Sequence, residues 1–228
     1  MNIAIIVAAG RGTRMGGEQA KQFRALAGVP LIIHTLRRFE QSTTIGEIVA
    51  VMPATETANF LALAERFHLT KLARVVAGGA TRTASVWHGL KTVRAASAGI
   101  IAVHDGVRPF VTPEEIDRTV RAAEETGAAL LTAPVVDTIK VIEGERIAQT
   151  LLRGNLRRAL TPQCFRYELL RRAYEHARAH NLEATDDSAL VELLGAQVAV
   201  VEGDARNIKI TRPEDFALAE ILLRENHQ

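Results

Sequence analysis

The sequence is poor in cysteine, with Cys164 the only one among 228 residues. A single thiol excludes an intramolecular disulfide framework and any cluster of several thiolates on one metal within the chain. A lone cysteine of this kind usually fills a gap in the hydrophobic core. We therefore expect Cys164 to be a core residue.

The chain also lacks a strong excess of either charge, because 28 Lys and Arg face 26 Asp and Glu. This near balance gives little support to nucleic-acid binding. No run of about 18 apolar residues is present to form a membrane span. Met1 leads into a strand-like segment rather than a charged leader with a cleavage site. These features predict a cytoplasmic protein.

What the chain does contain is enough apolar sequence, 47% of its residues, to bury one large core. Short apolar runs alternate with stretches of helical periodicity, which predicts an α/β fold with a mainly parallel sheet flanked by helices. The predicted strands are residues 3–9, 48–52, 74–77, 100–104 and 129–133. The predicted helices between them are residues 31–39, 56–67, 83–93 and 113–125.

The pattern changes after residue 135. Residues 138–142 and 147–151 have the composition of two paired strands around a short turn at Gly144. We expect a projecting β-arm at about 135–160 within a single domain of residues 1–228. The rest of the chain predicts helices at 167–180, 187–194 and 213–224 and a strand at 198–202.

A glycine-rich turn follows the first predicted strand, at residues 8–17. Its small residues permit close backbone approach, and its amides are suited to phosphate oxygens. A dinucleotide fingerprint would need a glycine where Met15 stands, and a P-loop would need a lysine where Glu18 stands. Arg14 and Lys21 add positive charge, so the turn indicates polyphosphate binding through a different motif.

The glycine-rich turn followed by Lys21-Gln22-Phe23 resembles the signature turn of sugar-phosphate nucleotidyltransferases. Six further segments match, in order, motifs of the 2-C-methyl-D-erythritol 4-phosphate cytidylyltransferase family. They are Gly-Gly-Ala-Thr-Arg-Thr-Ala-Ser-Val at 78–86, His-Asp-Gly-Val-Arg-Pro at 104–109, Ala-Pro-Val-Val-Asp-Thr at 133–138, Leu-Thr-Pro-Gln at 160–163, Thr-Asp-Asp at 185–187 and Asn-Ile-Lys-Ile-Thr-Arg-Pro-Glu-Asp at 207–215. The resemblance implies a Rossmann-like nucleotidyltransferase fold over nearly the whole chain.

The activity that this resemblance implies is transfer of CMP from CTP to 2-C-methyl-D-erythritol 4-phosphate. Pyrophosphate leaves, and 4-diphosphocytidyl-2-C-methyl-D-erythritol forms, in the non-mevalonate pathway to isoprenoid precursors. A phosphate monoester is already anionic near neutral pH, so its attack on the α-phosphorus of CTP needs no dedicated general base. The site must instead align two polyanions and stabilise their negative charge, and the positively charged side chains of Arg and Lys are suited to this role.

The resemblance also implies which residues form the site. Catalytic roles fall to Arg14, Lys21, Arg153 and Lys209. Nucleotide contacts fall to Ala8, Ala9, Gly10, Gly12, Gly79, Ala80, Ser85, Asp105 and Gly106. Acceptor contacts fall to Asp105, Arg108, Thr138, Arg153, Thr161, Thr185 and Lys209. Magnesium is expected to bind mainly through the phosphates of CTP, with Asp105 as the candidate protein ligand.

Two of these assignments have an alternative in the residues themselves. Asp105 directly follows a predicted strand, where the ligand crevice of an open α/β sheet lies, but a turn or cap aspartate has the same sequence context. Arg153 belongs to a basic group with Arg157 and Arg158 that is equally typical of a solvated surface. We expect the neighbouring His104 to be structural.

The family resemblance implies a homodimer in which the arm reaches the neighbouring subunit and supplies Thr138, Arg153 and Thr161 to its site. An exposed hairpin edge also needs a partner. Three other functions remain open from the sequence. They are a ribitol-5-phosphate cytidylyltransferase, a noncatalytic nucleotide sensor and, by fold analogy alone, an oxidoreductase.

Overall fold

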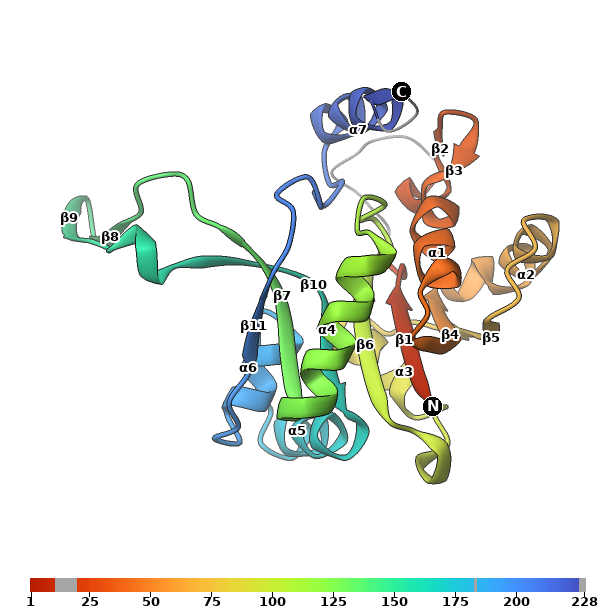
Figure 1. The fold of residues 1–228 in the computed structure, drawn as a ribbon, viewed down its shortest axis with the longest axis horizontal. Coiled ribbons are helices and arrows are strands. Elements are labelled where there is room, and N and C mark those ends of the chain that lie inside the picture. Colours follow the sequence, from red (N-terminus) through yellow and green to blue (C-terminus); the bar gives the residue numbers. More distant parts are fainter. Residues whose placement is uncertain (11–19, 183, 226–228) are drawn as a thin grey trace.

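The computed structural model describes residues 1–10, 20–182 and 184–225, and its centre is a seven-stranded sheet (Figure 1). The strand order is β11-β7-β10-β6-β1-β4-β5. The strands are β1 (Asn2–Val7), β4 (Ile45–Met52), β5 (Leu72–Ala77), β6 (Ile100–Asp105), β7 (Ala128–Pro134), β10 (Arg157–Arg166) and β11 (Ala199–Glu202). Every neighbouring pair is parallel except the two pairs that involve β10. The predicted α/β class with a mainly parallel sheet is confirmed.

Helices cover both faces of this sheet (Figure 1). One face packs against α1 (Leu31–Gln41), α2 (Thr57–Arg66) and α4 (Pro113–Thr126). The other packs against α3 (Arg82–Leu90), α5 (Tyr167–Ala179) and α6 (Asp187–Glu192). Because both faces are covered, side chains on both sides of a strand are buried, and the central strands are continuous apolar runs. In β1, Ala4 and Ile6 enter the first core while Ile3 and Ile5 enter the second.

The start of α4 illustrates how local sequence sets an element. The Thr112 hydroxyl accepts from the amide of Glu115 at 3.2 Å, and the Glu115 carboxylate accepts from the amide of Thr112 at 2.9 Å. This reciprocal capping box satisfies two backbone donors that the helix cannot. Pro113 stands in the first turn, and the helix ends at Gly127 with φ of 93°. The predicted helix is confirmed.

The strand β10 was not predicted. It enters antiparallel between β6 and β7, where Gln163 pairs with Val103 on one side and Leu130 on the other. Its first residues, including Arg157, are exposed, and its pairing with β7 shifts register between Ala159 and Gln163. Proline within the segment and the polar start hide the alternation that marks a strand.

The last part of the fold stands apart from the sheet. A short pair, β2 (Ala25–Leu26) and β3 (Val29–Pro30), packs beside α7 (Pro213–Glu225) in a small third core.

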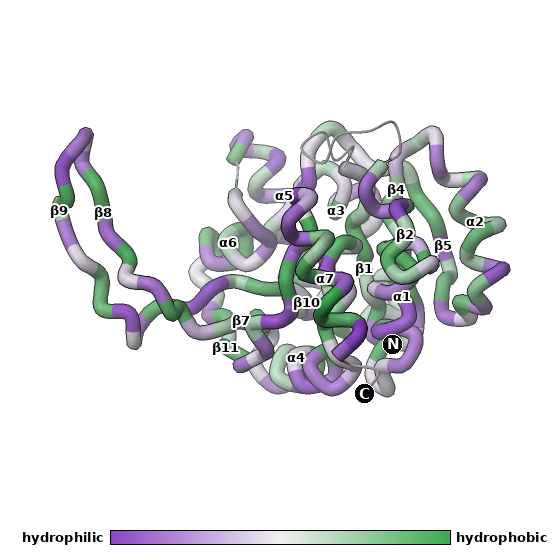
Figure 2. Tube along the Cα trace, turned by 90° about the horizontal axis from the view of Figure 1, so that it is seen from above, coloured by the Kyte–Doolittle hydropathy of each residue, from purple (hydrophilic) through white to green (hydrophobic). Residues whose placement is uncertain are grey.

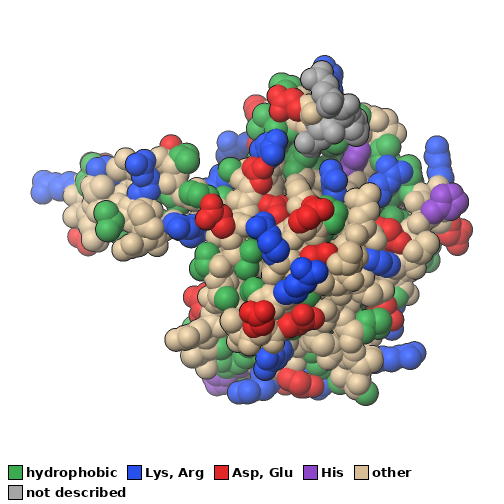
Figure 3. Space-filling view, in the orientation of Figure 1, with side chains coloured by type: hydrophobic (Ala, Val, Ile, Leu, Met, Phe, Trp, Pro, Cys, Tyr) green, Lys and Arg blue, Asp and Glu red, His purple; other side chains and the backbone are tan. Residues whose placement is uncertain are grey.

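Cys164 is buried, as predicted. On the face shown in Figure 3, acidic and basic side chains are interspersed, in keeping with the balanced composition. Within the described chain, no helix is both long and apolar enough to cross a membrane.

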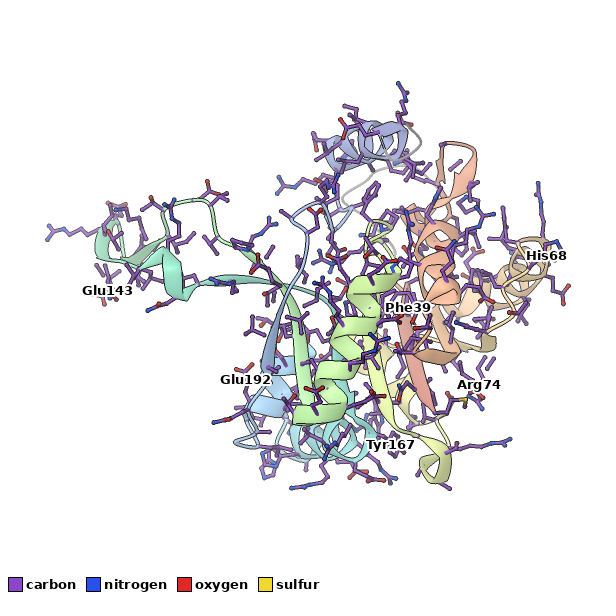
Figure 4. The ribbon with its side chains drawn as sticks, in the orientation of Figure 1. Phe39, His68, Arg74, Glu143, Tyr167 and Glu192 are labelled. Carbon is purple, nitrogen blue, oxygen red and sulfur yellow. The ribbon has the colours of Figure 1, made fainter. Side chains whose placement is uncertain are left out.

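The arm, residues 135–156, projects from the body between β7 and β10 (Figure 1). It carries the hairpin of β8 (Lys140–Glu143) and β9 (Arg146–Thr150), which pair only with each other in the described structure. Glu143 lies at its far end (Figure 4). Apolar positions run along the arm in Figure 2, and Val136, Ile142, Ile147 and Leu152 are exposed.

Candidate functional site

A cavity of about 710 Å³ opens at the carboxyl ends of β1, β4, β5 and β6, and we call it the strand-end pocket. Loops that follow parallel strands meet at one edge of the sheet, where ligands bind in open α/β folds. The lining residues are Val7, Ala8, Ala9, Gly10, Lys21, Gln22, Pro53, Ala54, Thr55, Gly78, Gly79, Ala80, Thr81, Arg82, Ser85, Asp105, Val107 and Lys209.

Most of the predicted nucleotide-binding residues line this pocket. They are Ala8, Ala9, Gly10, Gly79, Ala80, Ser85 and Asp105. Two other predicted residues, Gly12 and Arg14, lie outside the described residues. Gly106 is buried beneath the pocket: a Cβ there would lie 2.7 Å from Cδ1 of Ile32 and 2.8 Å from Cβ of Ala8. Gly106 therefore serves close packing of the strand ends.

One wall of the pocket is backbone brought unusually close to β1. A Cβ on Gly78 would lie 2.2 Å from Cβ of Ala9 and 2.9 Å from Oγ of Ser85. The amide of Gly79 donates to Oγ of Ser85 at 3.0 Å, which ties the turn to α3. Thr81 caps α3 by accepting from the amide of Ala84 at 3.0 Å. The positive end of this helix thus faces the pocket.

Asp105 is the charged centre of the pocket. Its Oδ1 lies 3.2 Å from Nε of Arg82, and its Oδ2 lies 2.9 Å from Nζ of Lys209 and 3.4 Å from Nε of Arg108. Burial by itself would raise the pKa of Asp105, but the positive charges of Arg82, Lys209 and Arg108 outweigh burial and hold this pKa well below its usual range. Asp105 is therefore ionised at neutral pH.

The loop that contains Asn207 supports both Arg108 and Lys209, the two residues that pair with Oδ2 of Asp105. Arg108 Nη1 donates to the carbonyl of Asn207 at 2.8 Å, and Asn207 Nδ2 donates to the carbonyl of Thr161 at 2.9 Å. Asn207 is fully buried, so the loop that carries Lys209 is anchored to β10 and to the segment that follows β6. Arg108 does not line the pocket and meets it only through Asp105.

His104 and Thr161 form a buried layer behind Asp105. His104 Nε2 donates to the carbonyl of Arg108 at 3.2 Å, so its Nδ1 accepts from the Thr161 hydroxyl at 2.9 Å. The same hydroxyl accepts from the Asp105 amide at 3.3 Å. Burial lowers the pKa of His104 to about 3, which keeps the ring neutral. The structural role expected for His104 is confirmed, and Thr161 touches the site through Asp105.

Lys21 and Gln22 come from a 3-10 helix, η2 (Lys21–Phe23), that follows the glycine-rich turn. Lys21 Nζ donates to the carbonyl of Ile210 at 3.2 Å, next to Lys209 in the chain. The fold therefore brings these two predicted catalytic lysines to one pocket from distant parts of the sequence. Gln22 Nε2 donates to the carbonyl of Ala8 at 2.7 Å and so holds the end of β1.

Sequence reasoning missed the role of Arg82. Its guanidinium joins Asp105 to Asp187, whose Oδ2 lies 2.7 Å from Nη2 of Arg82. The signal was present in two matched segments, one with Arg82 directly after the cap Thr81 and one with Asp186 beside Asp187. Only the fold shows that these segments meet.

Five predicted acceptor residues do not line the pocket within one chain: Arg108 and Thr161, which meet it through Asp105, and Thr138, Arg153 and Thr185. Thr138 and Arg153 lie on the arm, where Arg153 Nη1 donates to the carbonyl of Val136 at 2.8 Å and its side chain is exposed. Thr185 is also exposed and lies just before α6. The described members of the predicted catalytic set are thus divided: Lys21 and Lys209 line the pocket, and Arg153 lies on the projecting arm (Figure 1).

The described part of the pocket has few side chains that could bind a metal ion without help from a substrate. Within the described residues there is no group of three or more His, Cys, Asp or Glu side chains that could hold one. Asp105 is the only carboxylate among the described residues of the pocket. One carboxylate suits Mg²⁺ that is held mainly by substrate phosphates and water.

Comparisons with known proteins agree with this geometry. The family model described as 2-C-methyl-D-erythritol 4-phosphate cytidylyltransferase matches residues 2–225. Relatives with that name from Pelotomaculum thermopropionicum and Bacillus velezensis are each 44% identical to the chain. Both alignments cover 97% of this chain, with 93% and 95% of the respective relatives.

Solved structures give the same result. A 4-diphosphocytidyl-2C-methyl-D-erythritol synthase from Anaerococcus prevotii superposes with a TM-score of 0.87 at 29% identity, covering 98% of this chain and 96% of its own. A 2-C-methyl-D-erythritol 4-phosphate cytidylyltransferase from Thermus thermophilus has a TM-score of 0.79 at 36% identity, covering 98% and 100%.

Proposed function

This chain belongs to the 2-C-methyl-D-erythritol 4-phosphate cytidylyltransferase family, and we propose that its strand-end pocket binds CTP beside the acceptor. The enzyme transfers CMP from CTP to 2-C-methyl-D-erythritol 4-phosphate in the non-mevalonate isoprenoid pathway. The family predicted from the motifs is confirmed, and the ribitol acceptor is not favoured. The observation that carries the site assignment is the convergence of Lys21, Lys209 and Asp105 on one pocket.

In the proposed complex, the cytosine and ribose lie against the backbone wall of Gly78, Gly79 and Ser85. The triphosphate lies along residues 8–10 and Lys21, with Arg14 assigned from the family motif. Support comes from the pocket's size, which suits a nucleotide. Backbone amides and the start of α3 supply fixed positive dipoles for phosphate oxygens without any side-chain movement.

We assign Lys209 to the acceptor phosphate. The monoester oxygen attacks the α-phosphorus in line, the bond to the β-phosphate bridge breaks, and pyrophosphate leaves. Lys209 is 39% exposed at its side chain, while its partner Asp105 is 9% exposed, so the lysine is accessible to a ligand. Lys21 comes from η2, far from Lys209 in the sequence, and its positive charge offsets negative charge on the triphosphate. Cations placed where charge develops lower the barrier without a proton transfer.

We further propose Mg²⁺ as the divalent cofactor, held by CTP phosphates with Asp105 as the one protein carboxylate nearby. When bound, Mg²⁺ neutralises phosphate charge and orients the oxygens for displacement. The protein's own contribution is to keep Asp105 ionised. Its paired cations, Arg82, Arg108 and Lys209, do so at every pH where the enzyme would work.

We propose a homodimer of single-domain subunits in which the arm completes the neighbouring site. The exposed apolar residues of the arm, including Ile142 and Ile147, need a partner surface. Thr138 and Arg153 lie on the arm and do not line the pocket of their own chain. Arg153 would then hold the acceptor phosphate across the interface.

The proposed cellular location is the cytoplasm. Support comes from the one cysteine, Cys164, which is a buried free thiol, as is usual for proteins of reducing compartments. Fractionation of the native cell, with activity measured in each fraction, checks this assignment. Activity recovered only outside the cytoplasmic fraction would contradict it.

The test of the site is magnesium-dependent pyrophosphate release from CTP. The acceptors are 2-C-methyl-D-erythritol 4-phosphate, ribitol 5-phosphate and none, each with wild type and Lys209→Ala. Release that needs the erythritol acceptor and magnesium, and that falls in the variant, supports the proposal. Equal turnover by Lys209→Ala refutes the assigned role of Lys209, and turnover in the presence of a chelator refutes the metal requirement.

A further inference from the structure

We propose that Arg82 is a positioning residue for CMP transfer: it anchors Asp105 to the buried core, so that Asp105 holds Lys209 at the pocket. The inference rests on the proposed site, in which Lys209 binds the acceptor phosphate. Arg82 is the second residue after the turn at Gly79–Ala80 and lines the pocket itself.

The anchor for Arg82 is Asp187, whose side chain is fully buried. Its Oδ2 accepts from Nη2 of Arg82 at 2.7 Å, and its Oδ1 accepts from the Tyr174 hydroxyl. The backbone amide of Asp187 donates to Oε1 of Gln163 at 3.0 Å. With both oxygens and its amide engaged, Asp187 is held by α5 and β10 and cannot follow a ligand.

The two oxygens of Asp105 have separate partners. Oδ1 faces Nε of Arg82 at 3.2 Å, and Oδ2 faces Nζ of Lys209 at 2.9 Å. Arg82 therefore holds the carboxylate without competing with Lys209 for the same oxygen. When Lys209 turns toward a phosphate, Asp105 keeps Arg82 and Arg108 as partners. The carboxylate then stays in place for Lys209 to return.

The charges of this cluster leave a positive excess. Arg82, Arg108 and Lys209 carry three positive charges against two negative charges on Asp105 and Asp187. The cluster therefore carries one net positive charge, in addition to that of Lys21 in the pocket, toward an incoming dianion. Without Arg82 the balance would be two against two, and Asp105 would compete with the phosphate for Lys209.

A guanidinium is required at this position, because one planar fork must join two carboxylates at once. A lysine there can reach either Asp105 or Asp187, but its single nitrogen cannot keep both geometries. The alternative is a purely structural ion pair, in which loss of Arg82 leaves Asp187 buried and unpaired. That role predicts lower stability with unchanged kinetics of the folded enzyme.

The experiment compares Arg82→Lys and Arg82→Ala with wild type by steady-state kinetics, varying CTP and acceptor separately. Arg74 offers the matched control, because its side chain is 28% exposed against 27% for Arg82 and it pairs with Glu47 at 3.2 Å outside the pocket. Arg74→Lys and Arg74→Ala are measured in parallel. Thermal unfolding of each variant reports whether the assayed protein is folded.

We expect kcat of the folded Arg82 variants to fall by about 10- to 100-fold, as for loss of one aligned electrostatic contact, while KM for CTP changes much less. Added guanidinium chloride, at concentrations too low to denature, should restore part of the kcat of Arg82→Ala, whereas sodium chloride of equal ionic strength should not. The Arg74 variants should keep wild-type kcat.

Three outcomes would overturn the inference. Unchanged kcat in folded Arg82→Lys, with Lys209→Ala impaired, refutes the role of Arg82 and leaves the site standing. Loss of stability alone, with no guanidinium rescue, identifies a structural ion pair. Full activity of Lys209→Ala removes both the proposed site and the role of Arg82, because Arg82 acts through Lys209.

Discussion

Lys209 and Asp105 form an ion pair in the lining of the strand-end pocket, with Nζ 2.9 Å from Oδ2. The pair is unequal, because Asp105 has two further cationic partners while Lys209 is the more exposed side chain. Removal of the lysine therefore leaves no buried charge without a partner. This asymmetry separates the lysine's function from the stability of the fold.

Lys209→Ala should lower kcat/KM for the acceptor by about 100-fold, the usual effect of losing one aligned charge. The free energy of unfolding should change little. Pyrophosphate-release kinetics and urea unfolding check the two statements. Lys91→Ala, at an exposed position outside the pocket, is the control and should behave as wild type. A large loss of stability in Lys209→Ala would contradict the asymmetry.

Gly78→Ala should weaken CTP binding, because the new Cβ would lie 2.2 Å from Cβ of Ala9 and must push the pocket wall away from β1. Overpacking of this kind typically costs about 1–3 kcal/mol of stability. Calorimetric titration with CTP and urea unfolding measure both effects. At Gly154 a Cβ meets open space, so Gly154→Ala should change neither. Wild-type CTP affinity in Gly78→Ala would count against the proposed wall.

Stability should fall as pH drops below about 6.5, because His104 is neutral when folded, with a pKa of about 3, and protonates when unfolded. The unfolded state then binds more protons, which costs up to about 1.4 kcal/mol per pH unit. His104→Gln should flatten this slope between pH 6.5 and 5, and exposed His180→Gln should not. Burial also lowers the pKa of His34 in every variant, so the difference isolates His104.

Urea unfolding across that pH range is the measurement. The depressed pKa of Asp105 acts in the same direction, but only below about 3.8, outside the range. An equal pH slope in wild type and His104→Gln would show that the ring is not held neutral in the folded protein.

Mixing two impaired variants tests the shared site. In a two-fold dimer of Arg153→Ala with Lys209→Ala, one pocket receives both wild-type residues and the other receives neither. Random exchange of subunits should restore about a quarter of wild-type activity. Pyrophosphate release after the two proteins have been unfolded and refolded together measures the gain. No recovery, or a monomer by light scattering, would refute completion of the site by the arm.

Local sequence determined much of this protein. Strands β1, β4, β6 and β7 were predictable because inner strands covered on both faces are largely apolar, and β5, at the sheet edge, was predictable from its short run of β-branched residues. The start of α4 was predictable because Thr112 and Glu115 satisfy each other within one turn. Several pocket residues followed from the glycine-rich segments, where small side chains leave backbone at the surface of the cavity.

Only the tertiary structure decided which distant segments meet. The strand β10 forms because it pairs with β6 on one side and with β7 on the other. Its own sequence has neither an alternating pattern nor a continuous apolar run. Position 106 favours glycine because a Cβ there would clash with the side chains of Ile32 and Ala8. The bridge from Asp187 through Arg82 to Asp105 joins three parts of the chain, and no local pattern encodes such a contact. Hydrophobic periodicity specifies elements, whereas ion pairs depend on where packing places those elements.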